Sequence, residues 1–102
     1  MSDWVEVAKR EEIAPGQAKA ITVDDLMLAL VNLDGEFFAV DNICTHAFAV
    51  LTEGPMADGQ LQCPLHGARF DVRTGAVTAP PAWEPLRTYE VRVEGDVVSV
   101  KL

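Results

Sequence analysis

The two cysteines and two histidines of this chain all lie in one short segment. Cys44-Thr45-His46 and Cys63-Pro64-Leu65-His66-Gly67 each supply one thiol and one imidazole, and sixteen residues separate the two motifs. A Cys-x-His or Cys-x-x-His pair offers two ligands to a metal centre, provided that the two segments face each other. The chain is therefore expected to fold so that two loops distant in sequence come together.

Three interpretations of these four residues differ in their chemistry. A two-iron, two-sulfur cluster of Rieske type takes two thiolates on one iron and two imidazoles on the other, which uses every candidate ligand. A Cys2His2 zinc site usually pairs Cys with Cys and His with His, whereas both pairs here are mixed. A disulfide between Cys44 and Cys63 leaves both histidines unused and suits an oxidising compartment. The ligand chemistry favours the cluster and leaves the other two open.

Length and composition indicate one globular domain, which we expect to span residues 1–102. The chain has a mass of 11.1 kDa, with 49% apolar and 24% charged residues. Its formal charge of −8 would repel a phosphate backbone, so no nucleic-acid partner is expected. The same charge suits either docking on a basic patch of another protein or a solvated acidic face.

The N-terminal segment gives no indication of export. Residues 1–4 have neither the basic start nor the apolar run of a secretory signal. The longest apolar run, residues 26–31, is much shorter than the roughly 20 residues needed to cross a bilayer. We therefore expect a soluble, cytoplasmic protein without a membrane partner.

The first half of the chain has the pattern of β-strands. Residues 4–7 and 19–23 alternate between apolar and polar side chains, as half-buried strands do. Asp34-Gly35 joins the apolar runs 26–33 and 36–40, and an Asp-Gly pair between such runs is a strong hairpin signal. We predict two strands followed by this hairpin.

The second half begins irregularly and ends in strands. Residues 42–70 have little periodicity and several turn signals, so we expect two loops joined by a short strand there, which form the metal-binding region. Gly95-Asp96 predicts a closing hairpin of residues 89–93 with 97–100. No segment of 12 or more residues shows a helical stripe, and the domain is therefore predicted to be mostly β.

The two motifs resemble the cluster-binding loops of Rieske proteins. The similarity continues through residues 69–75 and Ala79-Pro80-Pro81, and the closing hairpin and length resemble the small Rieske-type ferredoxins of bacterial ring-hydroxylating dioxygenases. This resemblance implies an all-β Rieske fold, an antiparallel β-sandwich with a small cluster-binding subdomain formed by two loops. It also implies that one 2Fe-2S cluster is bound by four ligands, namely Cys44, His46, Cys63 and His66.

The chain departs from the high-potential Rieske proteins of respiratory complexes at four positions. Those proteins carry a disulfide between two further cysteines where this chain has Ala49 and Leu65. They place Ser and Tyr hydroxyls where this chain has Ala68 and Phe70. Hydrogen bonds to cluster sulfurs stabilise the reduced state, so their loss implies a low reduction potential.

A one-electron carrier is the function that this resemblance implies. No third histidine remains for a mononuclear iron site, and no G-x-G-x-x-G motif indicates a dinucleotide site, so catalysis by this chain is not expected. The expected partners are a flavin-dependent NAD(P)H reductase upstream and a terminal Rieske oxygenase downstream. The alternatives are the Rieske-like small subunit of an assimilatory nitrite reductase and a zinc-stabilised interaction module.

Electrons are expected to leave through His46 and His66, at the loop tips. An apolar collar with a polar rim would surround these histidines and contact a partner. Ordinary core packing is a slightly better explanation for Phe48 and Trp83. The residues expected in the collar are Ala47, Phe48, Leu65, Pro81 and Trp83, and those of the rim are Glu53 and Asp58.

Overall fold

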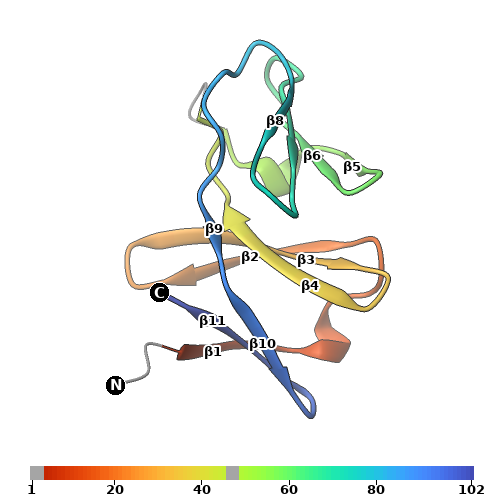
Figure 1. Cartoon of the computed structure of the whole chain (residues 1–102), viewed down its shortest axis with the longest axis vertical. Coiled ribbons are helices and arrows are strands. Elements are labelled where there is room, and N and C mark those ends of the chain that lie inside the picture. Colours follow the sequence, from red (N-terminus) through yellow and green to blue (C-terminus); the bar gives the residue numbers. More distant parts are fainter. Residues whose placement is uncertain (1–3, 46–48) are drawn as a thin grey trace.

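The computed structural model describes residues 4–45 and 49–102, and its strands form three antiparallel sheets (Figure 1). The first sheet has the order β1-β11-β10, with β1 at Trp4–Lys9, β10 at Val91–Glu94 and β11 at Val97–Lys101. The second has the order β2-β3-β4-β9, with β2 at Ala18–Val23, β3 at Leu26–Leu33, β4 at Glu36–Asp41 and β9 at Thr88–Tyr89. The third has the order β5-β6-β7-β8, with β5 at Met56–Ala57, β6 at Gln60–Gln62, β7 at Arg69–Asp71 and β8 at Val77–Ala79.

Helical structure in the described residues is limited to two short 3-10 turns, η1 at Arg10–Glu12 and η2 at Leu51–Glu53. Neither is long enough to cross a membrane. The predicted all-β, antiparallel class is confirmed. Figure 1 shows that the described residues form a basal region, 4–41 and 88–102, below a loop region, 42–45 and 49–87.

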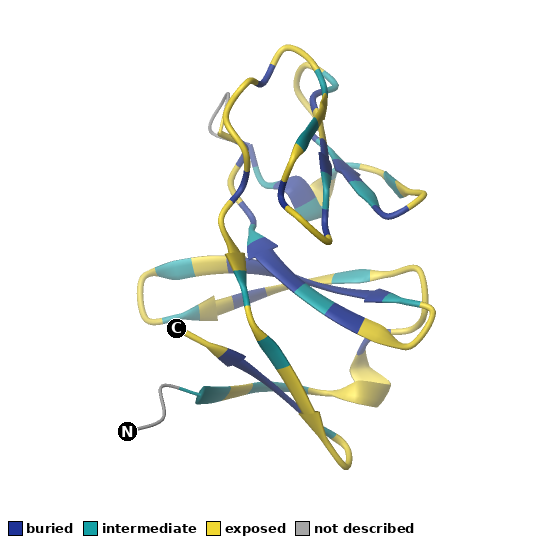
Figure 2. Ribbon diagram, in the orientation of Figure 1, coloured by how far each residue is buried: buried dark blue, intermediate teal, exposed yellow. Residues whose placement is uncertain are grey.

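The long apolar run in β3 reflects burial on both faces of the strand. Leu28 and Leu30 point into one core, while Ala29 and Val31 point into another. The middle sheet is thus packed between the first sheet and the loop region (Figure 2). The sequence of a strand buried on both faces is continuously apolar, without the alternation of apolar and polar residues seen in a half-buried strand.

The two cores have different contents. The basal core consists of Ile13, Ile21, Leu28, Leu30, Phe37, Ala39, Val98 and Val100. The loop core consists of Ala29, Val31, Val40, Cys44, Ala49, Leu51, Leu61, Cys63, Ala68, Phe70, Val72, Ala82 and Leu86.

Two hairpins turn on an Asp-Gly pair with positive φ at both residues. Asp34 and Gly35 have φ of 53° and 94°, and Leu33 faces Glu36 across the turn, which confirms the first predicted hairpin. Asp58-Gly59 makes the same turn, with φ of 55° and 74°, between β5 and β6. This hairpin joins the two Cys-His loops, where we had expected a single short strand.

The predicted strand 89–93 is divided at Glu90. Tyr89 pairs with Ala39 in the middle sheet, whereas Val91–Glu94 pair with β11 in the first sheet. The Tyr89 hydroxyl donates a 2.6 Å hydrogen bond to Asp41. Burial and this bond both disfavour the phenolate and raise the pKa of Tyr89. The chain therefore crosses from one sheet to the other at this point, and the closing hairpin is confirmed for β10 and β11.

Candidate functional site

Two loops of the same construction carry the candidate ligands. In the first, the Cys44 N–H donates to the Ala49 carbonyl at 2.9 Å, and in the second the Cys63 N–H donates to the Ala68 carbonyl at 2.7 Å. Each cysteine thus begins a loop that is closed by a bond to the fifth residue after it. Antiparallel pairing continues outward from both loops, through Ile43 with Val50 and through β6 with β7.

The described ligand candidates divide into a buried and an exposed part. Cys63 is 1% exposed and Cys44 is also buried, and both belong to the loop core. His66 is exposed, at the far side of the second loop, which turns back where the Gly67 N–H donates to the Cys63 carbonyl. His46, Ala47 and Phe48 lie outside the described residues.

Neither cysteine forms a disulfide, so that interpretation of Cys44 and Cys63 is wrong. Within the described part of the chain, no three Cys, His, Asp or Glu side chains are grouped closely enough to hold one metal ion. What the two loops offer is a pair of thiols inside the protein and an imidazole at its surface. This donor set fits a cluster in which thiolates and imidazoles bind different irons.

Small or apolar side chains surround the cysteines. Ala49, Ala68 and Phe70 are buried in the loop core, while Leu65 is 59% exposed. Alanine and phenylalanine side chains donate no hydrogen bonds. The four departures from the high-potential pattern therefore leave this side of the site without hydroxyl donors at these positions.

A third segment, residues 80–87, packs beside the first loop. The Thr45 hydroxyl donates a 2.7 Å hydrogen bond to the Glu84 carbonyl, and the Leu86 N–H donates to the Gly75 carbonyl at 2.8 Å. The backbones of Gly75 and Leu86 lie so close together that a Cβ at Gly75 would be 2.2 Å from the Leu86 carbonyl oxygen. The sequence marks Gly75 only as part of a turn, and it gives no sign of the contact between Thr45 and Glu84.

Trp83, in this segment, is 86% exposed. Core packing, which we had slightly favoured for this residue, is therefore wrong. Leu65 and Pro81 of the expected collar are also exposed, as are Glu53 and Asp58 of its rim. Trp83 lies next to Ala82, which is buried in the loop core.

A family model, the Rieske [2Fe-2S] domain, matches residues 3–90 of the chain. The chain belongs to this family. The Rieske domain is thereby assigned to nearly all of the sequence, and with it one 2Fe-2S cluster. The zinc-module interpretation is set aside, because the matching family binds an iron-sulfur cluster.

Relatives and solved structures place this Rieske protein among ferredoxins. It is 37% identical over 99 residues to the ferredoxin component of the naphthalene 1,2-dioxygenase system of Pseudomonas aeruginosa, covering 97% of this chain and 95% of that protein. It is 45% identical over 91 residues to the biphenyl dioxygenase ferredoxin subunit of Pseudomonas sp. strain KKS102, covering 88% and 84%. The ferredoxin of carbazole 1,9a-dioxygenase from Nocardioides aromaticivorans IC177 superimposes with a TM-score of 0.94, at 39% identity and 98% coverage of both chains.

The chain is a Rieske ferredoxin, an electron-transfer component of the type found in bacterial aromatic dioxygenase systems. A nitrite reductase small subunit from Mycobacterium tuberculosis also has a TM-score of 0.84 to it, at 24% identity, which shows a shared fold alone.

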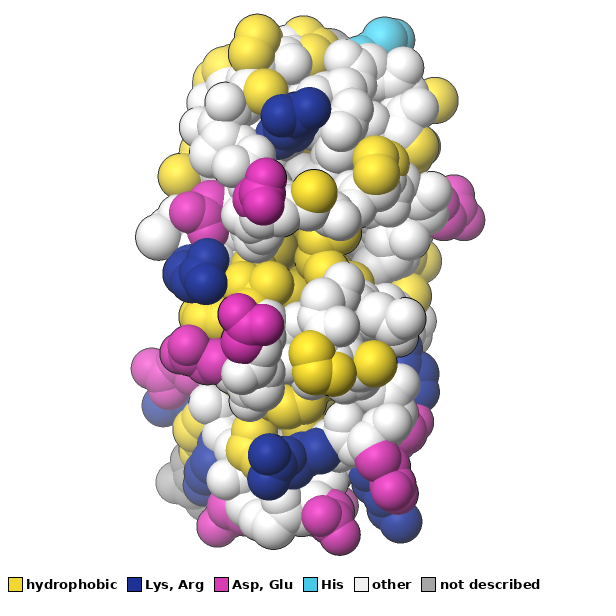
Figure 3. Space-filling model, turned by 90° about the vertical axis from the view of Figure 1, so that its right-hand side faces the viewer, with side chains coloured by type: hydrophobic (Ala, Val, Ile, Leu, Met, Phe, Trp, Pro, Cys, Tyr) yellow, Lys and Arg dark blue, Asp and Glu magenta, His cyan; other side chains and the backbone are white. Residues whose placement is uncertain are grey.

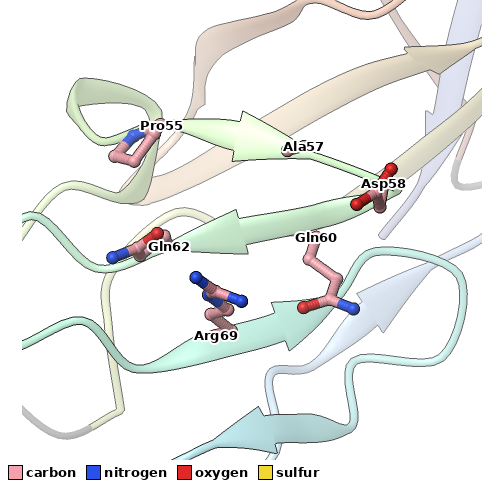
Figure 4. Close-up of a pocket in the computed structure, with 6 residues that line it drawn as sticks. All are labelled: Pro55, Ala57, Asp58, Gln60, Gln62 and Arg69. Atoms are coloured by element: carbon pink, nitrogen blue, oxygen red, sulfur yellow. The ribbon is translucent and has the colours of Figure 1, made fainter.

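A polar pocket of about 190 Å³ lies on the outer face of the third sheet of this ferredoxin. Leu61 and Phe70 alternate inward, so that Gln60, Gln62 and Arg69 point outward. Figure 4 shows Arg69 beside Gln62, at the end of the pocket nearer to the second loop, and Asp58 at the opposite end. Sequence reasoning did not predict this pocket, because its residues come together only when β6 and β7 pair.

The acidic charge of the ferredoxin is concentrated in the basal region. Among the described residues, the loop region has four acidic and three basic residues, a net charge of −1, and the basal region has eleven acidic and five basic residues, a net charge of −6. Figure 3 shows a histidine, apolar side chains and a basic group toward the upper end, with the acidic side chains further down. The end that presents His66 is therefore close to neutral.

Proposed function

We propose that this ferredoxin accepts one electron from a flavin-dependent NAD(P)H reductase and passes it to the terminal Rieske non-heme iron oxygenase of an aromatic-ring dioxygenase system. The observation that carries the proposal is the similarity, over almost the whole chain, to ferredoxin components of such systems. A ferredoxin of carbazole 1,9a-dioxygenase, solved in complex with its oxygenase, is 31% identical with a TM-score of 0.92. We place the protein in the cytoplasm, because NAD(P)H and reduced thiols are available there.

The proposed ligands are Cys44 and Cys63 for one iron and His46 and His66 for the other. Three observations support this assignment: the two loops are closed alike, both thiols are buried, and His66 is exposed. When bound, the cluster supplies one-electron oxidation and reduction. The buried cysteines keep their sulfur atoms away from water, while His66 lies where a partner can contact it.

A low reduction potential is part of the proposal. Ala68 and Phe70 are fully buried and have no hydroxyl, so these two side chains cannot stabilise added negative charge on the sulfurs. An electron held at low potential flows readily to an acceptor with a higher one. This property suits a carrier between a flavin and an oxygenase.

Reconstitution with purified partners tests the function. When NADH and the reductase are added, the cluster of the holoprotein should become reduced. The reduced form should give a rhombic EPR signal. It should be reoxidised when the terminal oxygenase, an aromatic substrate and oxygen are supplied. Cys63→Ser is the control, since it removes a proposed ligand. Reoxidation by a nitrite reductase and not by any dioxygenase component would overturn the proposal.

A further inference from the structure

Trp83 is the most exposed large apolar side chain of the described residues. It is 86% exposed, compared with 59% for Leu65 and less than 40% for the other exposed large apolar side chains. An exposed tryptophan offers a partner a large area of apolar surface, and tryptophan is enriched among the residues that dominate binding energy at protein interfaces. It is not part of either core, so packing within the fold does not account for its position.

The backbone around Trp83 is held in place. Ala82 and Leu86, on either side of it, are buried in the loop core. Between them, the Glu84 carbonyl accepts a hydrogen bond from Thr45, the residue between Cys44 and His46. The tryptophan is thus presented on an ordered segment attached to the first ligand loop. An anchor that is already positioned loses little conformational entropy when it binds.

Arg69 offers a charged contact at the same end of the molecule. It directly follows the second loop and pairs with Ala79, the last residue before the segment that carries Trp83. Its side chain is exposed, and none of the described residues forms an ion pair with it. In the pocket of Figure 4 its guanidinium lies beside Gln62, with Asp58 at the far end. The group is therefore available to a carboxylate of a partner.

We propose that Trp83 and Arg69 form a two-point docking site for the terminal oxygenase, with Trp83 entering an apolar socket and Arg69 pairing with a carboxylate. This inference rests on the proposed function and specifies how its partner is recognised. The charge distribution supports it, because the loop region, with four acidic residues and three arginines, has a net charge of −1, whereas the described residues of the basal region carry −6. A basic partner surface would be attracted to the basal region instead. A largely apolar surface with one carboxylate opposite Arg69 matches the end that presents His66.

Hydroxyl-radical footprinting of the holoprotein measures contact directly. Trp83 should be oxidised rapidly in the free protein and several-fold more slowly in the presence of the oxygenase. Trp4 in β1, which lies under the Arg92 guanidinium at 4.4 Å, is the internal control and should react at the same rate in both samples. Protection of Trp83 by the reductase but not by the oxygenase would assign the anchor to the other partner and overturn the proposal.

Kinetics separate the apolar and charged contributions. Trp83→Ala should raise the KM of the oxygenase for the ferredoxin about tenfold, with little change in kcat, at low and high salt alike. Arg69→Gln should raise it a few-fold at low ionic strength, and this difference should vanish at high salt because ions screen the pair. Trp4→Phe and Arg92→Gln are the matched controls in the basal region and should stay within twofold of the wild type.

The outcomes distinguish this inference from the proposed function. If wild-type ferredoxin does not reduce the oxygenase at any concentration, the proposed function fails. If it does, and Trp83→Ala with an unchanged EPR spectrum has the wild-type KM, the docking site fails alone. Equal losses in the Trp83 and Trp4 variants would also overturn it, because they would indicate a general effect of removing tryptophan.

Discussion

The loop region and the basal region of this ferredoxin are stabilised in different ways. In the described residues, the basal core is built almost entirely from large aliphatic and aromatic side chains, with Ala39 as its one small member. The loop core contains four alanines and both cysteines, and the strands of the loop region, β5 to β8, are only two or three residues long. Burying small side chains yields less hydrophobic free energy than burying large ones. The loop region is therefore expected to depend on its cluster, and the basal region on packing.

The two regions nevertheless share one sheet. The side chains of β3 and β4 alternate between the two cores, so neither core is complete without these strands. A buried asparagine lies next to each core: Asn32 donates to the Ile13 carbonyl, and Asn42 donates to the Thr52 hydroxyl. The middle sheet thus gives the loops a rigid base that does not itself need the metal.

The largest expected difference between the regions follows from removing a ligand. Cys63→Ser should abolish assembly of the normal cluster, because metal binding contributes folding free energy to a small site. Amide hydrogen exchange should then show lost protection in β5 to β8, while β1, β10 and β11 keep theirs. Iron content, the EPR signal and exchange by mass spectrometry measure this. A variant with full iron content and the native EPR signal would contradict the ligand assignment, and equal loss of protection in both regions would contradict the division between them.

Paired truncations of buried leucines give the next largest effect. Leu61→Ala in the loop core and Leu30→Ala in the basal core should each lower the free energy of unfolding by about 2–5 kcal/mol, because both remove fully buried side chains. Only Leu61→Ala should also accelerate loss of the cluster on mild heating. Denaturant titration measures the first quantity, and bleaching of the visible absorption measures the second. Faster bleaching in the Leu30 variant alone would contradict the expectation that cluster retention depends on the loop core and not on the basal core.

Local signals in the sequence predicted the fold better than they predicted the surface. Asp34-Gly35 specifies its hairpin within a few residues, because both positions need a positive φ. The division at Glu90 depends on pairing with β4 and β11, which are distant in sequence, so the local pattern showed one strand. The ligand spacing likewise led to two loops that the structure builds alike, although which atoms bind iron stays a prediction.

Trp83 shows a second limit of what the sequence alone can predict. An apolar residue between prolines and buried neighbours fits core packing as well as partner contact, and only its exposure in the structure separates the two. Arg69 is similar, since its pocket forms only through the pairing of β6 with β7. Net charge was equally ambiguous, because the value of −8 does not reveal that most of it lies in the basal region.

Hydroxyl groups introduced near the cysteines should change the reduction potential without large structural effects. We expect the wild-type value in the bottom third of the Rieske range of roughly −150 to +300 mV, and Ala68→Ser combined with Phe70→Tyr should raise it. Phe37→Tyr, which adds the same hydroxyl to a residue of the basal core, is the control and should leave the potential unchanged. Direct electrochemistry near neutral pH measures all three proteins. A wild-type value well above zero, or a double variant with an intact cluster and the wild-type potential, would count against the hydrogen-bond argument.

The smallest expected effect compares one acidic residue from each region. Asp58 lines the same pocket as Arg69 without pairing with it, so Asp58→Asn should remove a negative charge that repels a partner carboxylate and lower the KM of the oxygenase for the ferredoxin by about twofold. Asp96→Asn removes the same charge from the turn between β10 and β11, at the end of the molecule away from the loop region (Figure 1), and should change the KM by less than that. Ions screen charges beyond about 10 Å at 0.1 M ionic strength, so the basal acids act weakly on docking at the loops. Asn tolerates the positive φ of Asp58, and both variants should therefore fold normally. A larger change in the Asp96 variant would show that the basal region takes part in partner recognition.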